Sequence, residues 1–490
     1  MIDLLGRAST TAEMDGSRAS GHLAGTPAPI SIEERRGWIR RFGGLIEGRT
    51  DEFVHLIVDE IGKPAHEALT SDVLTLLSAC RWHERRLATL LAPQRLRGGP
   101  IWMPGQRHFQ HRAPLGRVAI IATWNYPVQL LGVQLVQAIA GGNDVVVKPS
   151  ERAPRTQRLL LETAREAGLS ARRLSWVDPT REAGQALLLT ERFDHIVFTG
   201  STGVGRAVAE LAAQTLTPTT LELAGRDSAL VLADADLPRA AARIWQAVTM
   251  NAGQTCMAPR RVLVEAEAWG GFLAALAPLA AAARPVSLID AQSAETCYAL
   301  ARHAVAAGGR SASAIMEPPR GRELRPLAIV DCPKDAELVE GRHFGPVVAI
   351  VRVRDMVEAL QVHHRAGQHL AASVYTRSRR RAGELRDVLG VSFVTINDSV
   401  LPTVHPAASI GGRGESGWGV SRGHEGLLAM TRPVVVSTSG SRLRVSTEPP
   451  TAAAMRGLRT LSRWLYGTPT NRPPRADDER RTADDRRGGP

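Results

Sequence analysis

Cysteine is scarce in this sequence, and its spacing argues against two kinds of site. Only Cys80, Cys256, Cys297 and Cys332 occur in 490 residues. They are too few and too scattered for a disulfide framework, and no two of them form the CxxC pair that is typical of zinc ligands. We therefore expect a reducing compartment, the cytoplasm.

Long apolar runs are missing as well. No segment reaches the roughly 18 uninterrupted apolar residues of a membrane-spanning helix, and the opening letters MIDLLGRASTTAEMDGS lack the apolar core of a signal peptide. We therefore expect a soluble protein. A chain of 490 residues also exceeds the size at which one hydrophobic core keeps growing, so we expect at least two domains.

Lysine is rare, whereas arginine is abundant. Lysine occurs only at Lys63, Lys148 and Lys334, so arginine supplies nearly all the positive charge behind a formal net charge of +12. The arginines are spread along the chain between acidic residues, and nucleic acid is therefore not an expected partner. A lysine retained in such a chain invites a specific explanation.

Apolar segments of strand length alternate with amphipathic helical patterns from residue 117 onward. Examples are RVAIIAT, DVVVKPS and HIVFTG, and a second series runs from SALVLAD to VSFVTIND. Strands that are apolar along their whole length are typical of parallel sheets covered on both faces. The pattern predicts an α/β fold: helices from about residue 31, a doubly wound Rossmann-type domain and a second α/β domain.

The ends of the chain differ in composition from the rest. The predicted segments are a flexible lead-in (1–30), helices with the first α/β domain (31–222), the second α/β domain (223–400), a return to the first domain (401–445) and a disordered charged tail (446–490). Within the tail, MRGLRTLSRWLYG predicts a short amphipathic helix near 455–467. Docking on the protein itself, or disorder, is favoured over contact with an anionic membrane surface.

The segment NAGQTCMAP, residues 251–259, carries the strongest indication of chemistry. An isolated cysteine is ordinarily buried packing, which is our interpretation of the other three. Cys256 instead follows Gly253, Gln254 and Thr255, a polar turn in which a small residue lets the backbone approach a ligand. A thiol there would be nucleophilic if the local field lowered its pKa.

Two further polar residues lie at strand ends. Glu222 stands between Leu221 and Leu223, where desolvation would raise its pKa toward that of a general base; a paired structural carboxylate is the alternative. Asn125 follows the apolar strand 118–122, and its amide either donates to an oxyanion or caps the next helix. The residues alone leave both choices open.

Two strand-to-helix junctions indicate nucleotide contacts. Lys148 and Glu151 follow a predicted parallel strand, at the edge where open α/β sheets bind ligands, and point to a ribose or phosphate. In FTGSTGVGRA, Gly200, Ser201 and Gly205 let a phosphate approach a helix N-terminus. The spacing is GxxGxG and not the dinucleotide pattern GxGxxG, so this motif is weak by itself.

Together and in this order, these segments resemble the NAD(P)-dependent aldehyde dehydrogenase superfamily over about residues 31–440. The separation of Glu222 from Cys256, and that of Asn125 from Lys148, match the family pattern. LTPTTLELAG and GESGWG look closest to the class-three-like branch. The resemblance implies an NAD(P)-binding domain, a catalytic domain and a bridging element near 97–115 and after 401 used in oligomerisation, hence a homodimer or homotetramer.

The resemblance also implies roles for individual residues. Cys256 would be the nucleophile, Glu222 the general base, and Asn125 with the Cys256 backbone N–H the oxyanion hole, in the NAD(P)+-dependent oxidation of an aldehyde to a carboxylic acid through a thioester. The implied cofactor contacts are Thr123, Trp124, Lys148, Ser150, Glu151, Gly200, Ser201, Gly205, Leu223 and Phe344. NAD is favoured over NADP, because Glu151 near the adenosine ribose would repel a 2′-phosphate.

The sequence departs from the family pattern in several places. Two positions before Phe344, where the family usually carries a glutamate that holds the nicotinamide ribose, stands Arg342, with Glu340 two residues further back. The stretch between Cys256 and Phe344 is short, which we expect to reshape the substrate side more than the cofactor side. The family motif LELGG is altered at Ala224.

Two alternatives therefore remain beside the hydrolytic enzyme. One is a non-catalytic binding or scaffold protein of the same fold that lost its hold on the cofactor at Arg342. The other is a CoA-acylating aldehyde dehydrogenase, which would not need Glu222. The class-three-like motifs and the amphipathic tail together indicate a long-chain or apolar aldehyde as substrate.

Overall fold

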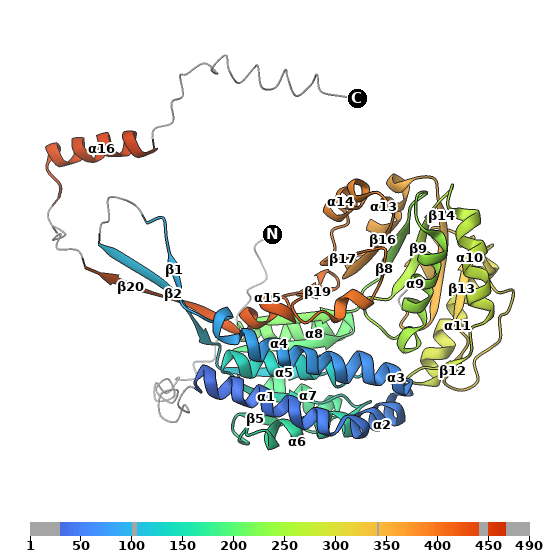
Figure 1. Cartoon of the computed structure of the whole chain (residues 1–490), viewed down its shortest axis with the longest axis horizontal. Helices are drawn as coiled ribbons and strands as arrows, with labels where there is room; N and C mark the ends of the chain where they lie inside the picture. The colour runs from blue at the N-terminus through green and yellow to red at the C-terminus, as the bar shows by residue number, and fades with distance from the viewer. Residues whose placement is uncertain (1–29, 100–104, 341–342, 441–448, 467–490) are drawn as a thin grey trace, which may run out of the picture. The chain divides into compact units, whose positions relative to one another are not determined.

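The computed structural model describes residues 30–99, 105–340, 343–440 and 449–466, and Figure 1 shows their course. The chain forms two compact units, Met1–Gln94 with Phe109–Val436, and Arg95–His108 with Ser437–Pro490. The domain boundaries predicted at 222 and 400 both fall inside the larger unit.

The larger unit opens with helices. Ser31 and Glu34 form a capping box, in which each side chain accepts a hydrogen bond from the other residue's backbone N–H. A π-helical turn lies between the third and fourth of these helices. The elements are α1 (Ile32–Gly48), α2 (Thr50–Ile61), α3 (Ala65–Glu67), the π-helix η2 (Ala68–Val73) and α4 (Leu74–Leu90).

A six-stranded sheet follows in the order β19-β7-β6-β3-β4-β5, and it is parallel except for β19. The strands are β3 (Arg117–Ile121), β4 (Asp144–Lys148), β5 (Leu174–Trp176), β6 (His195–Gly200), β7 (Thr219–Leu223) and β19 (Gly417–Trp418). The helices are α5 (Gln129–Gly141), α6 (Pro154–Glu166), α7 (Arg181–Thr190), α8 (Thr202–Gln214) and α15 (Gly423–Ala429).

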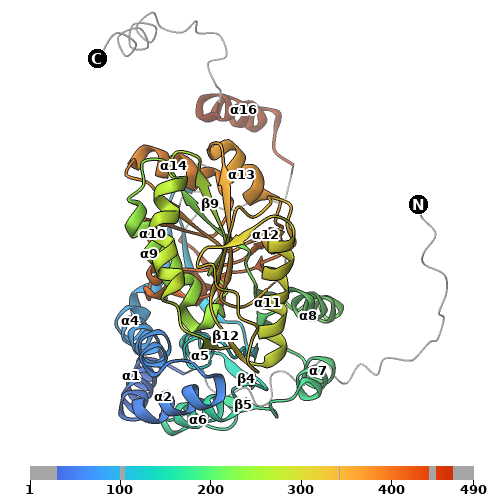
Figure 2. The same ribbon diagram turned by 90° about the vertical axis from the view of Figure 1, so that its right-hand side faces the viewer.

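Both faces of this sheet are covered, which confirms the doubly wound prediction. Val118 and Ile120 belong to a core shared with α1, α4, α5 and α6, whereas Ala119 and Ile121 belong to a second core with α7 and α8. Figure 2 shows α1 and α2 on one side of β4 and β5, and α7 and α8 on the other. Strand order reverses between β3 and β6, and ligands bind at the carboxyl ends of strands at such a point.

A seven-stranded sheet forms the second half of the unit, in the order β11-β13-β14-β9-β8-β16-β17 and parallel except for β11. The strands are β8 (Asp227–Val231), β9 (Pro259–Glu265), β11 (Arg310–Ser311), β13 (Leu327–Val330), β14 (Val347–Val353), β16 (Ala371–Tyr375) and β17 (Phe393–Ile396). The predicted second α/β domain is thus present as a sheet with its own two cores.

Helices cover both faces of this second sheet as well. The core on one face includes α9 (Leu237–Thr249) and α10 (Trp269–Ala281). The core on the other face includes four helices, which are α11 (Ala291–Ala306), α12 (Glu337–Glu340), α13 (Met356–His364) and α14 (Arg379–Val388). The short elements are η3 (Met250–Gly253), β10 (Val286–Ser287), β12 (Glu323–Leu324), β15 (Gln368–His369), η4 (Leu401–Val404) and β18 (Arg413–Gly414).

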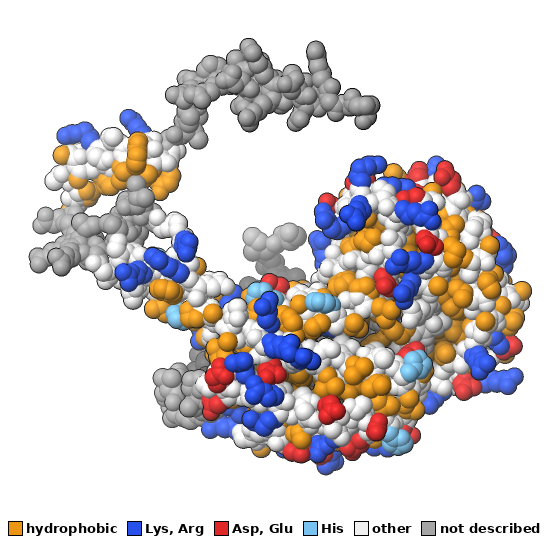
Figure 3. Space-filling model, in the orientation of Figure 1, with side chains coloured by type: hydrophobic (Ala, Val, Ile, Leu, Met, Phe, Trp, Pro, Cys, Tyr) orange, Lys and Arg blue, Asp and Glu red, His pale blue; other side chains and the backbone are white. Residues whose placement is uncertain are grey.

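A three-stranded sheet in the order β1-β2-β20 and a terminal helix complete the structure. The elements are β1 (Gln94–Leu96), β2 (Gln106–Pro114), β20 (Thr431–Ser439) and α16 (Ala452–Tyr466). Helix α16 lies where the sequence predicts an amphipathic helix, and Figure 3 shows its hydrophobic and basic side chains on different sides. Neither α16 nor any other described helix combines the length and apolar character needed to cross a membrane.

Candidate active site

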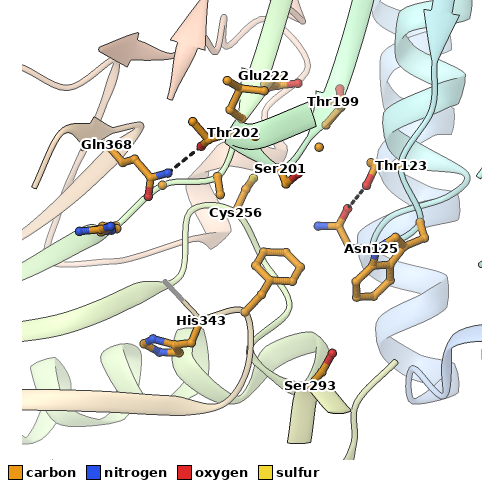
Figure 4. Close-up of a pocket in the computed structure, with 18 of the residues that line it drawn as sticks. Thr123, Asn125, Thr199, Ser201, Thr202, Glu222, Cys256, Ser293, His343 and Gln368 are labelled. Atoms are coloured by element: carbon orange, nitrogen blue, oxygen red, sulfur yellow. Dashed lines mark hydrogen bonds between the residues drawn. The ribbon is translucent and has the colours of Figure 1, made fainter. Parts of the chain in front are cut away.

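Two cavities of the larger unit meet at Cys256 and Glu222. The larger, about 430 Å³, lies at the carboxyl ends of β3 and β6 and includes Trp124 and Ser201 in its wall. The smaller, about 210 Å³, is lined by α5 and by η4 with its neighbours. Cys256 and Glu222 line both, and Figure 4 shows them in the larger one. The two residues with the strongest sequence indication of chemistry therefore share one place.

Cys256 lies between the turn η3 and strand β9. It is partly exposed, whereas the other three cysteines are buried. The local field does not activate the resting thiol: burial, followed by the negative charges of Glu222 and Asp227, raises the pKa of Cys256 to about 12, against the lowering effects of Arg260 and Arg422. At neutral pH the thiol is therefore protonated, and attack requires a base nearby.

The turn before Cys256 has an unusual backbone that several side chains hold in place. Residues 251–253 all have positive φ, and a Cβ on Gly253 would lie 2.3 Å from the carbonyl carbon of Gly345, so only glycine fits. Arg260 donates to the carbonyls of Gly253 and Thr255, each at 2.8 Å. The hydroxyls of Thr255 and Tyr126 lie 2.6 Å apart. The side chains of Arg260 and Tyr126 thus hold in place the turn that leads to the thiol.

Glu222 lies in β7, paired with Thr199 of β6 and Gly417 of β19. It is buried, and its Oε2 has no hydrogen-bond partner among the described residues. Burial raises the pKa of Glu222, partly offset by the positive charge of Arg422 and by the side chain of Ser421. The choice between the two roles left open by the sequence, a general base and a paired structural carboxylate, stays a prediction.

Asn125 is buried in the wall of the larger cavity, on the segment that follows β3. Its Nδ2 donates to the carbonyl of Gln254 at 3.1 Å, and its Oδ1 accepts from Thr123 at 3.3 Å (Figure 4). It does not cap α5, because Oδ1 of Asp72 accepts from the backbone N–H groups of Val128 and Gln129, each at 3.1 Å. The capping alternative is therefore wrong. The amide has a second N–H proton for a ligand.

The predicted cofactor contacts divide into two groups. Those that line the larger cavity are Thr123, Trp124, Gly200, Ser201, Leu223 and Phe344. Those outside its wall are Lys148, Ser150, Glu151 and Gly205. Lys148 and Glu151 form an ion pair with each other, Ser150 donates its backbone N–H to Oε1 of Gln157 at 2.7 Å, and Gly205 packs against Leu223. The roles of both groups stay predictions.

Trp124 and Phe344, two of the predicted cofactor contacts, lie together in the wall of the larger cavity. The rings of Trp124 and Phe344 meet edge to face with centroids 5.9 Å apart. Arg342 lies outside the described residues, and Glu340 forms an ion pair with Arg365 and does not line the larger cavity. Glu340 therefore does not replace the glutamate missing before Phe344.

Part of the cavity wall was not predicted from the sequence. Helix α11, between Cys256 and Phe344, lines the larger cavity, and among the described residues of this stretch only Met257 reaches the smaller one. The expectation that this short stretch reshapes the substrate side more than the cofactor side stays a prediction. The missed residues include Arg226, Gln292, Ser293, Thr296, Cys297, His343, Gln368 and Arg422. Their spacing gave no signal because they come from separate elements.

Comparison with known proteins decides the family. The model of the aldehyde dehydrogenase family matches residues 18–436. The chain belongs to the aldehyde dehydrogenase family. The 4,4'-diapolycopene aldehyde oxidase of Methylomonas sp is 29% identical over 83% of this chain and 78% of its own. Aldehyde dehydrogenase family 3 member A2 of Mus musculus is 30% identical over 77% of this chain and 78% of its own.

Solved aldehyde dehydrogenases have the same architecture. The NAD+ complex of the Bacillus cereus aldehyde dehydrogenase covers 84% of this chain and 85% of its own at 25% identity, with a TM-score of 0.78. The predicted family, its α/β fold and its class as an oxidoreductase acting on aldehydes are thereby confirmed. The family 3 relative agrees with the class-three-like motifs. A nicotinamide cofactor is supported by the neighbours, which include both NAD- and NADP-dependent enzymes.

Proposed function

We propose that this aldehyde dehydrogenase converts an aldehyde to a carboxylic acid through a covalent adduct on Cys256, with Glu222 as the general base. The observation that carries the proposal is the junction of the two cavities, because Cys256 and Glu222 line both. A substrate in the smaller cavity and a cofactor in the larger one would then meet at the thiol. Cys256 is the partly exposed cysteine of the described residues, and Oε2 of Glu222 is a buried carboxylate oxygen without a hydrogen-bond partner among them.

The first step is attack of the Cys256 sulfur on the aldehyde carbon. The proton of the thiol, whose pKa is raised to about 12, passes to the Glu222 carboxylate as the C–S bond forms. The carbonyl oxygen becomes an oxyanion, and Asn125 Nδ2 with the backbone N–H of Cys256 would stabilise it. The product of this step is a thiohemiacetal on Cys256.

The larger cavity supplies a suitable site for a nicotinamide cofactor. Its volume of about 430 Å³ suits a small-molecule ligand, the N-terminus of α8 at Ser201 offers backbone N–H groups to a pyrophosphate, and Trp124 and Phe344 offer apolar surface to a ring. A bound nicotinamide cofactor would supply the hydride acceptor that oxidation of the Cys256 thiohemiacetal to a thioester requires. We favour NAD over NADP because of Glu151.

Hydrolysis of the thioester completes the reaction. Glu222 first releases to solvent the proton that it took from the thiol. It then takes a proton from water as the water oxygen attacks the thioester carbon, and the Cys256 sulfur leaves as a thiolate that regains a proton from Glu222 as the acid forms. The unpartnered Oε2 of Glu222 can accept the proton from water. A CoA-acylating enzyme would not need this carboxylate, which is why the hydrolytic reaction is favoured.

We further propose a long-chain or apolar aldehyde as the substrate. The smaller cavity is lined mainly by apolar side chains, which are Leu130, Met250, Met257, Val400, Leu401, Val404 and Ile410. Removing an apolar chain from water into such a channel is favourable, at about 0.8 kcal/mol for each CH2 group. The name of the Methylomonas relative supports a substrate of this kind. A higher kcat/KM for succinic semialdehyde than for decanal would contradict the proposal.

The test is formation of the reduced cofactor from NAD+ and from NADP+ with a panel of aldehydes. Cys256→Ala should abolish turnover, and Glu222→Gln should release at most one equivalent of reduced cofactor, because the thioester would then accumulate. Cys332→Ala is the matched control, since Cys332 is a buried cysteine outside both cavities. Wild-type protein that neither binds nor reduces either cofactor would favour the scaffold alternative.

A further inference from the structure

Arg422 is a buried cation of the smaller cavity that the reaction described above does not use. It lies between the bridge of Ile410 with Ser421 and the start of α15, and only 6% of it is exposed. It lines the smaller cavity together with Cys256 and Glu222. A charge is costly to bury unless other charges or hydrogen bonds compensate it.

The guanidinium lacks an ion pair with a described carboxylate, since none lies within 4.0 Å of it. Its near partner is the Gln129 amide, whose oxygen, in the orientation that satisfies both groups, accepts from the two Nη atoms at 3.2 and 3.3 Å. Gln129 also lines the smaller cavity. One neutral amide does not neutralise the charge of Arg422. The negative field that compensates this charge therefore comes from Cys256 and Glu222, which line the same cavity.

The backbone of Arg422 is held in a conformation that an arginine rarely adopts. Its φ is 65°, in the region that favours glycine. Its N–H donates to Oε1 of Gln137 at 3.2 Å, and its carbonyl accepts from Gly426 at 2.9 Å. A strained non-glycine residue that its surroundings hold in place is typical of functional sites.

Four charged groups act on the thiol. Glu222 and Asp227 raise the pKa of Cys256, and Arg260 and Arg422 lower it. Arg260 holds the turn before Cys256 in place, because it donates hydrogen bonds to the carbonyls of Gly253, Gly345 and Thr255. Arg422 lines the smaller cavity together with both the thiol and the carboxylate, and it lowers the pKa of each.

We propose that Arg422 is a positioning residue of the active site, whose buried positive charge favours the Cys256 thiolate during attack and the Glu222 carboxylate during hydrolysis. This rests on the proposed roles of Cys256 and Glu222. The charge acts through space, and Arg422 itself exchanges no proton and forms no bond with the substrate. A neutral side chain at this position should leave the cavity open and the thiol less ionised.

The experiment measures alkylation of Cys256 without any aldehyde or cofactor. Iodoacetamide is neutral and iodoacetate is anionic; both react with the thiolate, and mass spectrometry of the peptide that carries Cys256 separates it from the other cysteines. The variants are Arg422→Met, Arg422→Gln and the charge-conserving Arg422→Lys. Arg352→Met is the matched control, because Arg352 is exposed on β14 and lines neither cavity.

Removal of the charge should slow alkylation by iodoacetamide about tenfold at pH 8, which corresponds to a rise of about one unit in the thiol pKa. The rate ratio of iodoacetate to iodoacetamide should fall as well, since the anionic reagent loses its attraction to the guanidinium. Arg422→Lys should retain most of both effects, and Arg352→Met should match wild type. A merely structural role would not change the ratio of the two reagents.

Equal rates and an equal reagent ratio in wild type, Arg422→Met and Arg422→Gln would overturn the inference about Arg422 while leaving the proposed reaction intact. The proposed reaction fails by a different result: full alkylation of Cys256 in wild-type protein that leaves turnover of aldehyde unchanged. Thermal unfolding of each variant shows whether it is folded, and Arg422→Gln keeps the hydrogen bonding of the site if Arg422→Met does not fold.

Discussion

Lys63 donates a hydrogen bond from Nζ to the backbone carbonyl of Asn125, 2.9 Å away, and forms a fully buried ion pair with Asp72. Its ammonium group also lies 3.8 Å from the centre of the Tyr126 ring. Asp72 in turn accepts from the first N–H groups of α5. One of only three lysines in the chain thus ties the N-terminal helices to the segment that carries the proposed oxyanion donor.

Replacing Lys63 should strongly destabilise the protein. Lys63→Met leaves the Asp72 carboxylate buried without its partner, and breaking a buried pair in this way costs about 3–5 kcal/mol. Lys334→Met is the control, since Lys334 pairs with Glu358 at the surface and such pairs contribute at most about 1 kcal/mol. Urea unfolding measures both. A similar loss of unfolding free energy in the two variants would contradict the structural role of Lys63.

The acid side of the pH–rate profile should report Glu222. Because burial raises the pKa of this carboxyl, the base becomes protonated, and inactive, at a higher pH than an ordinary glutamate with a pKa of 4.5. The rate of thioester hydrolysis should therefore fall as pH decreases through that raised pKa. The measurement is single-turnover release of acid against pH. An acid limb at or below pH 4.5 would argue that another group limits the rate.

Gly253→Ala should be harmful, although it adds only a methyl group. The φ of Gly253 is 69°, and the new Cβ would lie within 2.5 Å of three backbone atoms of Gly345 and Pro346. We expect a loss of at least about 1–3 kcal/mol in unfolding free energy, and slower alkylation of Cys256 as the turn shifts. Gly44→Ala is the control: its Cβ would meet nothing within 4 Å on helix α1, so no loss is expected.

Phe344→Ala should weaken cofactor binding more than it changes the thiol. Phe344 lines the larger cavity beside Trp124, so its removal takes away apolar surface from the proposed cofactor site, and the KM for NAD+ should rise several-fold. Alkylation of Cys256 in the absence of cofactor is the internal control and should stay near the wild-type rate. An unchanged KM would remove Phe344 from the predicted cofactor contacts.

The sequence by itself determined the α/β fold and the residues at the ends of its strands. Apolar runs such as Val145–Val147 can be recognised in the sequence. A parallel strand that is buried on both faces carries apolar residues throughout, without alternating polar positions. Cys256, Glu222 and Asn125 could be selected because each interrupts or ends such a run with a polar or reactive group. These signals are local, so they survive without knowledge of the tertiary structure.

Only the tertiary structure decided which residues share a cavity and which charges act on one another. Arg422 lies 166 residues after Cys256, and α11 reaches the larger cavity because the second sheet carries it there. The same holds for the pKa of Cys256: its direction could not be predicted from the sequence, and burial raises it. Desolvation and through-space charge depend on three-dimensional distance, and periodicity along the chain does not record it.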